Sequence, residues 1–215
     1  PETVTGFYQR LLESLAAQPG VEAVGAINLL PIAQFGNNGN YLVEGENITE
    51  VNRGPLAEMR VVTTGYFNAF GIPLLTGRFF NQQDQSNAPP VALVNQTWAK
   101  RHAASPQDVV GKRFGFGGDQ RWTVVGVVGD VKQSGLTQNT RAEIYYPHAQ
   151  APNPSLSLIV RGSTDPTNLT TTLRREVLKL DPAQPLANVR TMETVIVESI
   201  ADRRLNMLLL GLFAG

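Results

Sequence analysis

One order of local signals occurs near both ends of the chain and restricts how the chain can fold. Residues 4–18 carry apolar side chains at helical spacing, and residues 21–30 follow as a largely apolar strand. Residues 166–180 repeat the helix, and residues 186–190 are the next predicted strand. A proline follows each helix and ends it. The repeat indicates two α/β halves that pack together, although two unrelated helix–strand units would give the same pattern.

The residues between these units are predicted to be mainly β. Gly117-Gly118-Asp119 separates two predicted strands and is typical of a hairpin turn. Short helices are predicted to begin at Thr64 and Asn95, whose side chains suit the N-cap position. Residues 72–80 have the composition of a loop. Strands are predicted at 90–94, 113–116, 121–128 and 143–146.

A strand is also predicted at residues 57–62, where apolar residues alternate with Glu58 and Arg60. Together these patterns predict an α+β fold. We expect an α/β subdomain formed by two segments, residues 1–63 and 151–202, with a β-rich mixed subdomain, residues 64–150, inserted between them.

Composition excludes several classes of function. Lys plus Arg and Asp plus Glu both number 18, so the chain lacks the positive excess that nucleic-acid binders use to neutralise phosphates. It has no cysteine, which excludes disulfides, thiolate zinc sites and cysteine nucleophiles. His102 and His148 lie far apart, and neither has a second ligand at helical spacing. We therefore expect no metal, no other cofactor and no nucleic-acid partner.

No motif in the chain predicts an active site. Residues 111–118 match a phosphate-binding loop only in part, because Arg113 replaces the hydroxyl residue and a predicted strand follows instead of a helix. Asp130 follows an apolar strand, where a turn-forming role is more common than acid catalysis. There is no Gly-x-Ser-x-Gly sequence, and the carboxylates form no recognisable acid–base pair. We expect a protein that is not an enzyme.

The last residues are apolar on every side of a helix from Met207 to Gly215. At ~1.5 Å per residue this run covers about half of the ~30 Å hydrocarbon core of a bilayer. We expect residues 203–215 to be the start of a transmembrane helix; a buried terminal helix is the alternative.

An aromatic cluster lies at the start of the middle block, and its ordinary explanation is core packing. Its members are Tyr66, Phe67, Phe70, Phe79 and Phe80. The alternative is a surface that docks a partner. The candidate docking residues are Tyr66, Phe67, Phe70, Arg78 and Phe79.

The segment that carries this cluster resembles a known family. Residues 62–80 contain Tyr-Phe, then Gly-Ile-Pro, then Leu-Leu-Thr-Gly-Arg-Phe-Phe. This order is similar to that of the MacB-like periplasmic core domain of FtsX-like ABC transporter permeases, in the type abundant in Acidobacteria. The likeness continues through residues 90–95, 110–114, 123–131, 143–147 and 160–161, and residues 204–214 resemble the start of the family's second transmembrane helix.

The resemblance implies that the two-segment α/β subdomain is porter-like. It also implies a periplasmic domain of an inner-membrane protein, reached through flanking transmembrane helices. The implied partners are a second permease copy, a cytoplasmic ATPase domain and a periplasmic adaptor. The implied function is to couple cytoplasmic ATP hydrolysis to a periplasmic conformational change, for export or mechanotransmission. The alternatives are an extracytoplasmic sensor of a ligand or partner, and an FtsX-like regulator of a cell-wall hydrolase.

Overall fold

A computed structural model of the chain describes residues 2–33, 36–47, 50–132, 139–163, 165–184 and 186–200. Short stretches of 3-10 helix occur at Val51–Arg53 and Pro106–Val109. Residues 192–200 are also helical. The α-helices are α1 (Glu2–Ala16), α2 (Tyr66–Phe70), α3 (Gln96–His102) and α4 (Pro166–Leu180).

Ten strands within the described residues form one mixed sheet. The main path runs β10-β1-β4-β9-β6-β8-β7-β3, while β2 pairs with β4 and β5 pairs with β8. The pairs β4–β9 and β6–β8 are parallel, and the other pairs are antiparallel. The strands are β1 (Val21–Ile27), β2 (Asn38–Asn40), β3 (Leu42–Val43), β4 (Leu56–Val62), β5 (Leu74–Gly77), β6 (Val91–Asn95), β7 (Arg113–Gly115), β8 (Trp122–Val128), β9 (Glu143–Pro147) and β10 (Ser157–Gly162).

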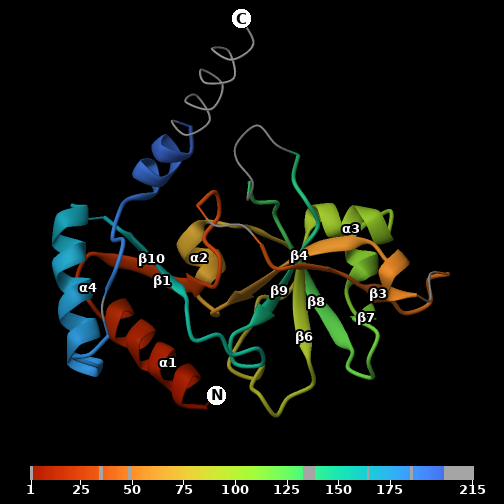
Figure 1. Cartoon of the computed structure of the whole chain (residues 1–215), viewed down its shortest axis with the longest axis horizontal. Coiled ribbons are helices and arrows are strands. Elements are labelled where there is room, and N and C mark those ends of the chain that lie inside the picture. Colours follow the sequence, from red (N-terminus) through yellow and green to blue (C-terminus); the bar gives the residue numbers. More distant parts are fainter. Residues whose placement is uncertain are drawn as a thin grey trace, which may run out of the picture.

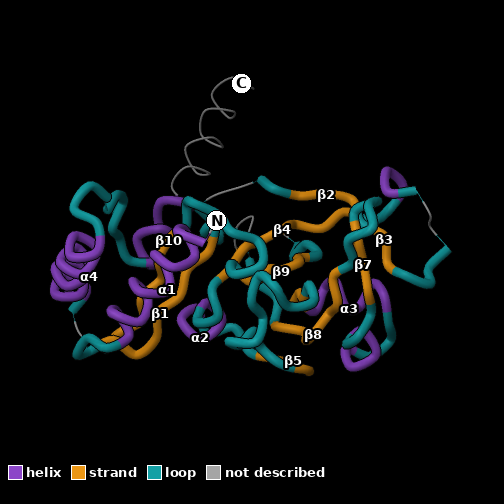
Figure 2. The backbone as a smooth tube through the Cα atoms, turned by 90° about the horizontal axis from the view of Figure 1, so that it is seen from below, coloured by secondary structure: helices purple, strands orange, loops and turns teal. Residues whose placement is uncertain are grey.

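Helices α1 and α4 form a layer beside β1 and β10 at one end of the sheet (Figures 1 and 2). Leu11 and Leu15 of α1 meet Val177 of α4 in a buried core, and Val24 of β1 packs against it. Because side chains alternate along a strand, the residues on either side of Val24 point to the opposite face of β1. That face receives α2. We call α1, α4, β1 and β10 the helical layer.

Two further cores lie on the two faces of the central strands. Ala57 and Val61 of β4 belong to the core that contains Trp98 of α3. Val62 of the same strand belongs to the core under α2, which also contains Tyr145 of β9. Alternation along β4 therefore places apolar side chains on both faces of the sheet, and the α+β fold predicted from the sequence is confirmed.

Local signals predicted several elements correctly. Residues 4–18 fall within or next to α1, and the second helix begins at Pro166 as expected. Asn95 caps α3, because its side-chain oxygen accepts a hydrogen bond from the Trp98 N–H. The turn at residues 117–119 joins β7 and β8 in an antiparallel pair. These predictions depended only on neighbouring residues, which explains their success.

Two predictions of secondary structure are wrong. Residues 186–190 form no strand, because Asn188 adopts a φ of 54° and Leu186 packs against the core between α1 and α4. Residues 72–80, predicted as a loop, contain β5, which pairs with β8 across an irregular register. Both errors concern segments whose structure depends on distant partners.

The division into a two-segment subdomain (1–63 and 151–202) and an inserted subdomain (64–150) remains a prediction. Strands β3 and β4 precede the expected insertion but pair with β7 and β9 inside it, so the sheet is continuous across that boundary. Residues 203–215, the expected start of a transmembrane helix, lie outside the described residues. Among the described residues, no helix has the length and apolar character needed to cross a membrane.

Glu176 connects the two helices of the helical layer. Its side chain is buried and accepts hydrogen bonds from Ser14 Oγ of α1 (2.8 Å) and from Lys179 Nζ (2.8 Å). The hydrogen bond from Lys179, followed by that from Ser14, lowers the pKa of Glu176 to about 2. Arg175 also contributes a hydrogen bond to this carboxylate, at 3.1 Å.

We predict that Glu176 makes stability depend on pH in the acid range. Because its pKa is lower in the folded state than the usual 4.5, its contribution is full above pH 4.5 and is lost as the pH falls towards 2. Urea denaturation should show that Glu176→Gln costs ~1–2 kcal/mol at pH 7 and much less near pH 2.5. The exposed Glu22→Gln is the control and should change little at either pH. An equal loss of unfolding free energy at both pH values would contradict the lowered pKa of Glu176.

Candidate functional site

Helix α2 lies directly on β1, with the two backbones in contact. A Cβ added at Gly25 of β1 would lie 2.4 Å from the Cα of Tyr66. A Cβ added at Gly65 would lie 2.0 Å from the carbonyl oxygen of Val24. Real Cβ atoms do not approach other atoms so closely, so the contact requires glycine on both sides. The predicted N-cap, Thr64, is wrong: Gly65 occupies that position without a side-chain hydrogen bond.

A second link between β1 and the central sheet follows the end of β4. Strands β1 and β4 share one paired position, Ile27 with Val62. Beyond it, the backbone N–H of Thr63 donates to Ala26 O (3.0 Å), and the Ala26 N–H donates to Thr63 Oγ1 (2.8 Å). Asn28 extends this ladder, because its Oδ1 accepts from the Val61 N–H at 2.9 Å. We call α2 together with this short ladder the joint between the helical layer and the central sheet.

Aromatic side chains hold α2 against the sheet. Tyr66 and Phe67 are 0% and 1% exposed. Phe67 stacks on Phe79 with ring centroids 5.4 Å apart and meets Tyr145 edge to face at 5.2 Å. Phe70 stacks on Tyr66 at 5.7 Å. Tyr66 and Phe67 therefore act in core packing, whereas Phe70 and Phe79 keep part of their surface in solvent.

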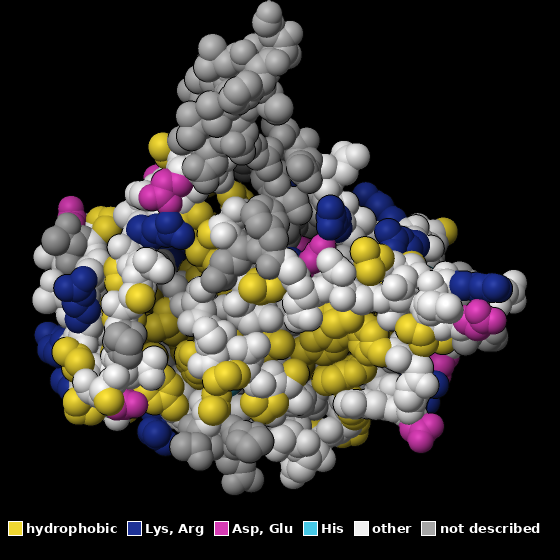
Figure 3. Space-filling view, in the orientation of Figure 1, with side chains coloured by type: hydrophobic (Ala, Val, Ile, Leu, Met, Phe, Trp, Pro, Cys, Tyr) yellow, Lys and Arg dark blue, Asp and Glu magenta, His cyan; other side chains and the backbone are white. Residues whose placement is uncertain are grey.

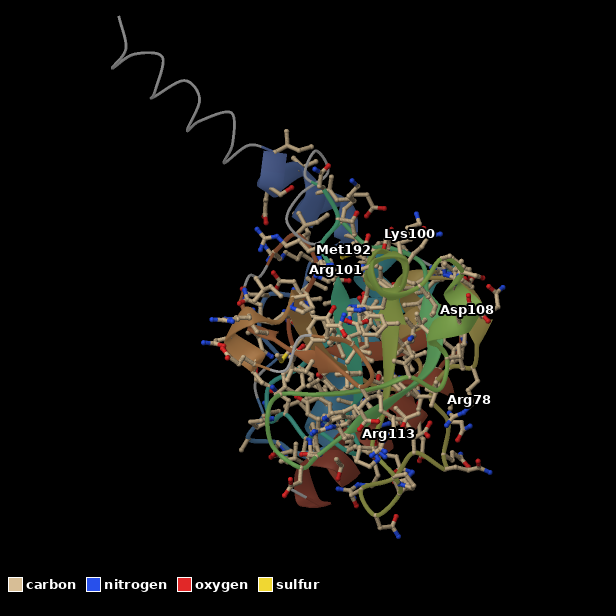
Figure 4. All side chains as sticks on the ribbon, turned by 90° about the vertical axis from the view of Figure 1, so that its right-hand side faces the viewer. Arg78, Lys100, Arg101, Asp108, Arg113 and Met192 are labelled. Atoms are coloured by element: carbon tan, nitrogen blue, oxygen red, sulfur yellow. The ribbon has the colours of Figure 1, made fainter. Side chains whose placement is uncertain are left out.

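Arg78, the remaining candidate docking residue, stabilises the loop that follows β5. Its guanidinium forms two hydrogen bonds with the Asp84 carboxylate, both 2.8 Å long. Asp84 also accepts a hydrogen bond from the Asn81 N–H. Burial opposes ionisation of Asp84, but the hydrogen bonds from Arg78 hold its pKa below the usual value. Arg78 lies at the edge of the molecule in Figure 4, with 42% of its side chain exposed.

The docking role expected for Tyr66, Phe67, Phe70, Arg78 and Phe79 thus remains a prediction. The structure brings the four aromatic rings together around α2. It places Arg78 in a loop that starts beside them. Only the partly exposed members, Phe70, Arg78 and Phe79, are accessible to a partner in the folded domain.

A buried polar cluster next to α2 was missed by sequence reasoning. Alternation along the predicted strand 57–62 places Glu58 and Arg60 on a polar face, yet they are only 6% and 2% exposed. Glu143 of β9 pairs in register with Glu58 and is fully buried. Burial raises the pKa of Glu143 to about 7. One sequence feature could have indicated this cluster: Glu143 is a third charged residue, and it lies at the start of another predicted strand.

The histidines and Asp130 have structural partners. His102 Nδ1 lies 2.6 Å from Glu46 Oε1, and His102 Nε2 lies 2.6 Å from the Tyr41 hydroxyl. His148 Nε2 lies 3.0 Å from the carbonyl of Asn153. Asp130 accepts hydrogen bonds from the N–H and hydroxyl of Thr97 and so satisfies a further N–H in the first turn of α3. In the described part of the chain, no three His, Cys, Asp or Glu residues are grouped in a way that could hold a metal ion.

A small groove lies at the C-terminal end of α4. It has a volume of about 300 Å³ and is lined by Arg174, Val177, Leu178, Pro182, Ala183, Gln184 and Leu186. Leu178 is 53% exposed there. Apolar side chains dominate the lining, with Arg174 and Gln184 as the polar groups.

The sequence of residues 2–191 matches the family profile of the MacB-like periplasmic core domain. The chain belongs to this family. It is therefore a periplasmic domain of an ABC transporter permease, a class of transport protein and not a typical class of enzyme. No curated protein sequence matches the chain significantly.

Solved structures share the fold. The periplasmic region of MacB from Actinobacillus actinomycetemcomitans has a TM-score of 0.53 and 18% identity over 79% of this chain and 72% of that one. A domain assigned to a permease protein from Porphyromonas gingivalis has a TM-score of 0.52 and 17% identity over 82% and 70% of the two chains. At these identities the likeness establishes the fold of a MacB-like domain.

We predict that the joint tolerates no side chain at Gly25. Gly25→Ala should lower the free energy of unfolding by ~3 kcal/mol, because the new methyl group meets backbone atoms that cannot move aside. Gly118→Ala is the matched control: a Cβ there meets nothing within 4 Å, and the change should stay within ~0.5 kcal/mol. Urea denaturation measures both. Equal stability of the two variants would contradict the close contact between α2 and β1.

Proposed function

We propose that this domain transmits mechanical change within an ABC permease. Cytoplasmic ATP hydrolysis moves the transmembrane helices, and the domain carries that movement to the periplasmic side, for export or mechanotransmission. It acts beside a second permease copy, with a cytoplasmic ATPase domain and a periplasmic adaptor as further partners. Residues 203–215 begin the helix that returns to the membrane.

The joint is the observation that carries this proposal. Helix α2 contacts β1 through backbone atoms at Gly25 and Gly65, so neither element can slide without breaking the packing. Movement of the helical layer is then passed to the central sheet as a rotation of one rigid unit. The aromatic cluster therefore serves the function by making the domain stiff.

The ends of the described chain support a bend near the C-terminal side. The first turn of α1 lies at the bottom of the view in Figure 1, whereas the helix at residues 192–200 lies near its top. Residues 186–191 between α4 and the last helix have no regular secondary structure. We propose that this connection bends, so that both flanking segments reach one membrane and the last helix moves relative to the sheet.

We propose the central sheet as one of two candidate surfaces for the adaptor. On the face shown in Figure 3, hydrophobic side chains gather over the central sheet, although the residues of β6 and β9 themselves are buried. Apolar surface of this kind favours contact with another protein. The partly exposed Phe70, Arg78 and Phe79 remain the second candidate surface.

Spin labels test the mechanical role in the full-length permease with its ATPase. Leu178→Cys on α4 reports the distance between the domains of two copies, since this side chain is 53% exposed and the present 215 residues contain no cysteine. We predict that trapping the ATPase with ATP and vanadate shifts this distance distribution. A label pair at Val110 and Leu178 within one domain is the control and should not change. An unchanged distance between copies would refute the proposal.

The groove at the end of α4 favours a second candidate function, a periplasmic sensor. A preformed apolar site with a few polar groups suits a small ligand. A thermal-shift screen of the folded domain should then find a compound that raises Tm, and Leu178→Arg should abolish that shift. A regulator of a cell-wall hydrolase predicts instead that the full-length permease retains a hydrolase in a pull-down, with no stabilising small molecule.

A further inference from the structure

The buried polar cluster is formed by two neighbouring parallel strands. Glu58 and Arg60 lie on β4, and they pair in register with Glu143 and Tyr145 on β9. Since these positions alternate with the apolar residues of the opposite core, all four side chains point to the same face of the sheet. Tyr66 of α2 belongs to the core on this face. The four side chains on the strands and Tyr66 are between 0% and 6% exposed.

Arg60 forms an ion pair with Glu58 in this structure. Its Nη2 lies 3.2 Å from Glu58 Oε2. Its Nη1 donates to the carbonyl oxygens of Gly36 (3.1 Å) and Met59 (2.9 Å). Arg60 therefore links Gly36 to β4, beside the hydrogen bond from the Met59 N–H to the Asn37 carbonyl oxygen (2.8 Å). Glu58 also pairs with Arg141, through Oε1 at 3.0 Å.

The hydrogen bonding around Glu143 is incomplete. Its Oε2 accepts a hydrogen bond from the Tyr145 hydroxyl. Among the described residues, its Oε1 has no partner, and the same holds for Arg60 Nε and the Tyr66 hydroxyl. Buried polar atoms are rarely left without a partner, so this acceptor and these two donors have the capacity to form further hydrogen bonds.

Charged and titratable groups from every neighbouring element act on Glu143. Arg60 favours its ionised form, whereas Glu58 and Asp130 oppose it. Burial and the nearby carboxylate raise the pKa values of Tyr66 and Tyr145, so both phenols stay neutral. Arg141 neutralises Glu58 on its other oxygen. Glu143 is thus the group of the cluster whose charge can change near neutral pH.

We propose that Glu143 and Arg60 form a proton-operated switch inside the domain. Neutral Glu143 leaves Arg60 paired with Glu58 and bonded to the carbonyl of Gly36. Ionised Glu143 is a buried charge, which is costly unless it is paired, so it draws the Arg60 guanidinium towards Oε1. Arg60 then releases Gly36, and the chain before β2 loosens. The switch does not depend on the proposed mechanical function.

The sign of the pH effect follows from the direction of the pKa change. The pKa of Glu143 is about 7 in the folded state and near the usual 4.5 in the unfolded chain. The folded state therefore holds a proton that the unfolded state has lost between these values. The stabilisation is full below pH 4.5 and is lost as the pH rises through 7.

Urea denaturation at pH 5, 6, 7 and 8 tests the switch with Glu143→Gln, which stays neutral throughout. The unfolding equilibrium constant of the wild type, divided by that of the variant, should rise about tenfold per pH unit up to pH 7 and then level off. Glu22→Gln, an exposed glutamate on β1, is the control and should give a ratio that is flat with pH. A flat ratio for Glu143→Gln as well would overturn the proposal.

Hydrogen exchange tests the movement of Arg60. At pH 8, the amides of residues 38–40 in β2 should exchange faster in the wild type than in Glu143→Gln at the same pH. At pH 5 the two proteins should exchange alike. Equal exchange at pH 8 would show that Arg60 does not leave Gly36, and it would refute the switch even if Glu143 titrates.

Carbon NMR of the wild type tests the titration of Glu143 directly, and it does so even if the Glu143→Gln variant does not fold. In protein labelled with [13C]glutamate, one side-chain carboxyl should titrate near pH 7. Tyr145→Phe removes a hydrogen bond that lowers the pKa of Glu143, so that titration should move to higher pH. If every glutamate carboxyl titrates below pH 5.5, Glu143 is not the proton-binding group and the proposal fails.

Discussion

The backbone contact between α2 and β1 is the constraint on which the rest of the structure depends. It brings a short helix so close to a strand that Gly25 and Gly65 admit no side chain. Once α2 is held there, the Tyr66 and Phe67 rings fill the space under the helix. The same contact attaches the helical layer to the central sheet, where strand pairing alone offers one residue pair, Ile27 with Val62. A five-residue helix thus adds a close backbone contact to that single residue pair.

The buried polar cluster follows from the same packing. Tyr66 of α2 covers the face of β4 and β9 that carries Arg60 and Glu143, so these charges are removed from water when the helix docks. Their burial costs free energy, which Arg60 offsets through hydrogen bonds to Glu58 and to two backbone carbonyls. The joint and the buried polar cluster therefore share the side chain of Tyr66.

The sequence predicted the elements whose signals are local. The asparagine cap of α3 and the glycine turn between β7 and β8 need only a few adjacent residues, and both were found. The motif at residues 62–80 located the aromatic cluster and indicated the family. The site was predicted only in part: its rings were identified, but whether Tyr66 and Phe67 face a partner or the core depended on β1, which lies forty residues earlier in the chain.

The features that escaped prediction depend on pairing between distant segments. Alternation predicts one buried face for β4, but this strand lies between neighbours in a sheet with cores on both faces, so Arg60 is buried along with Val61. Residues 186–190 were predicted to form a strand, yet no described strand pairs with them and Asn188 turns the backbone. A local pattern indicates which secondary structure a segment can form. The register of β4 against β9 then determines which charged side chains lie next to each other. The proton-operated switch is such a product of register, since Glu143 pairs with Glu58 and lies diagonally across from Arg60 on the neighbouring strand, although the two residues are far apart in sequence.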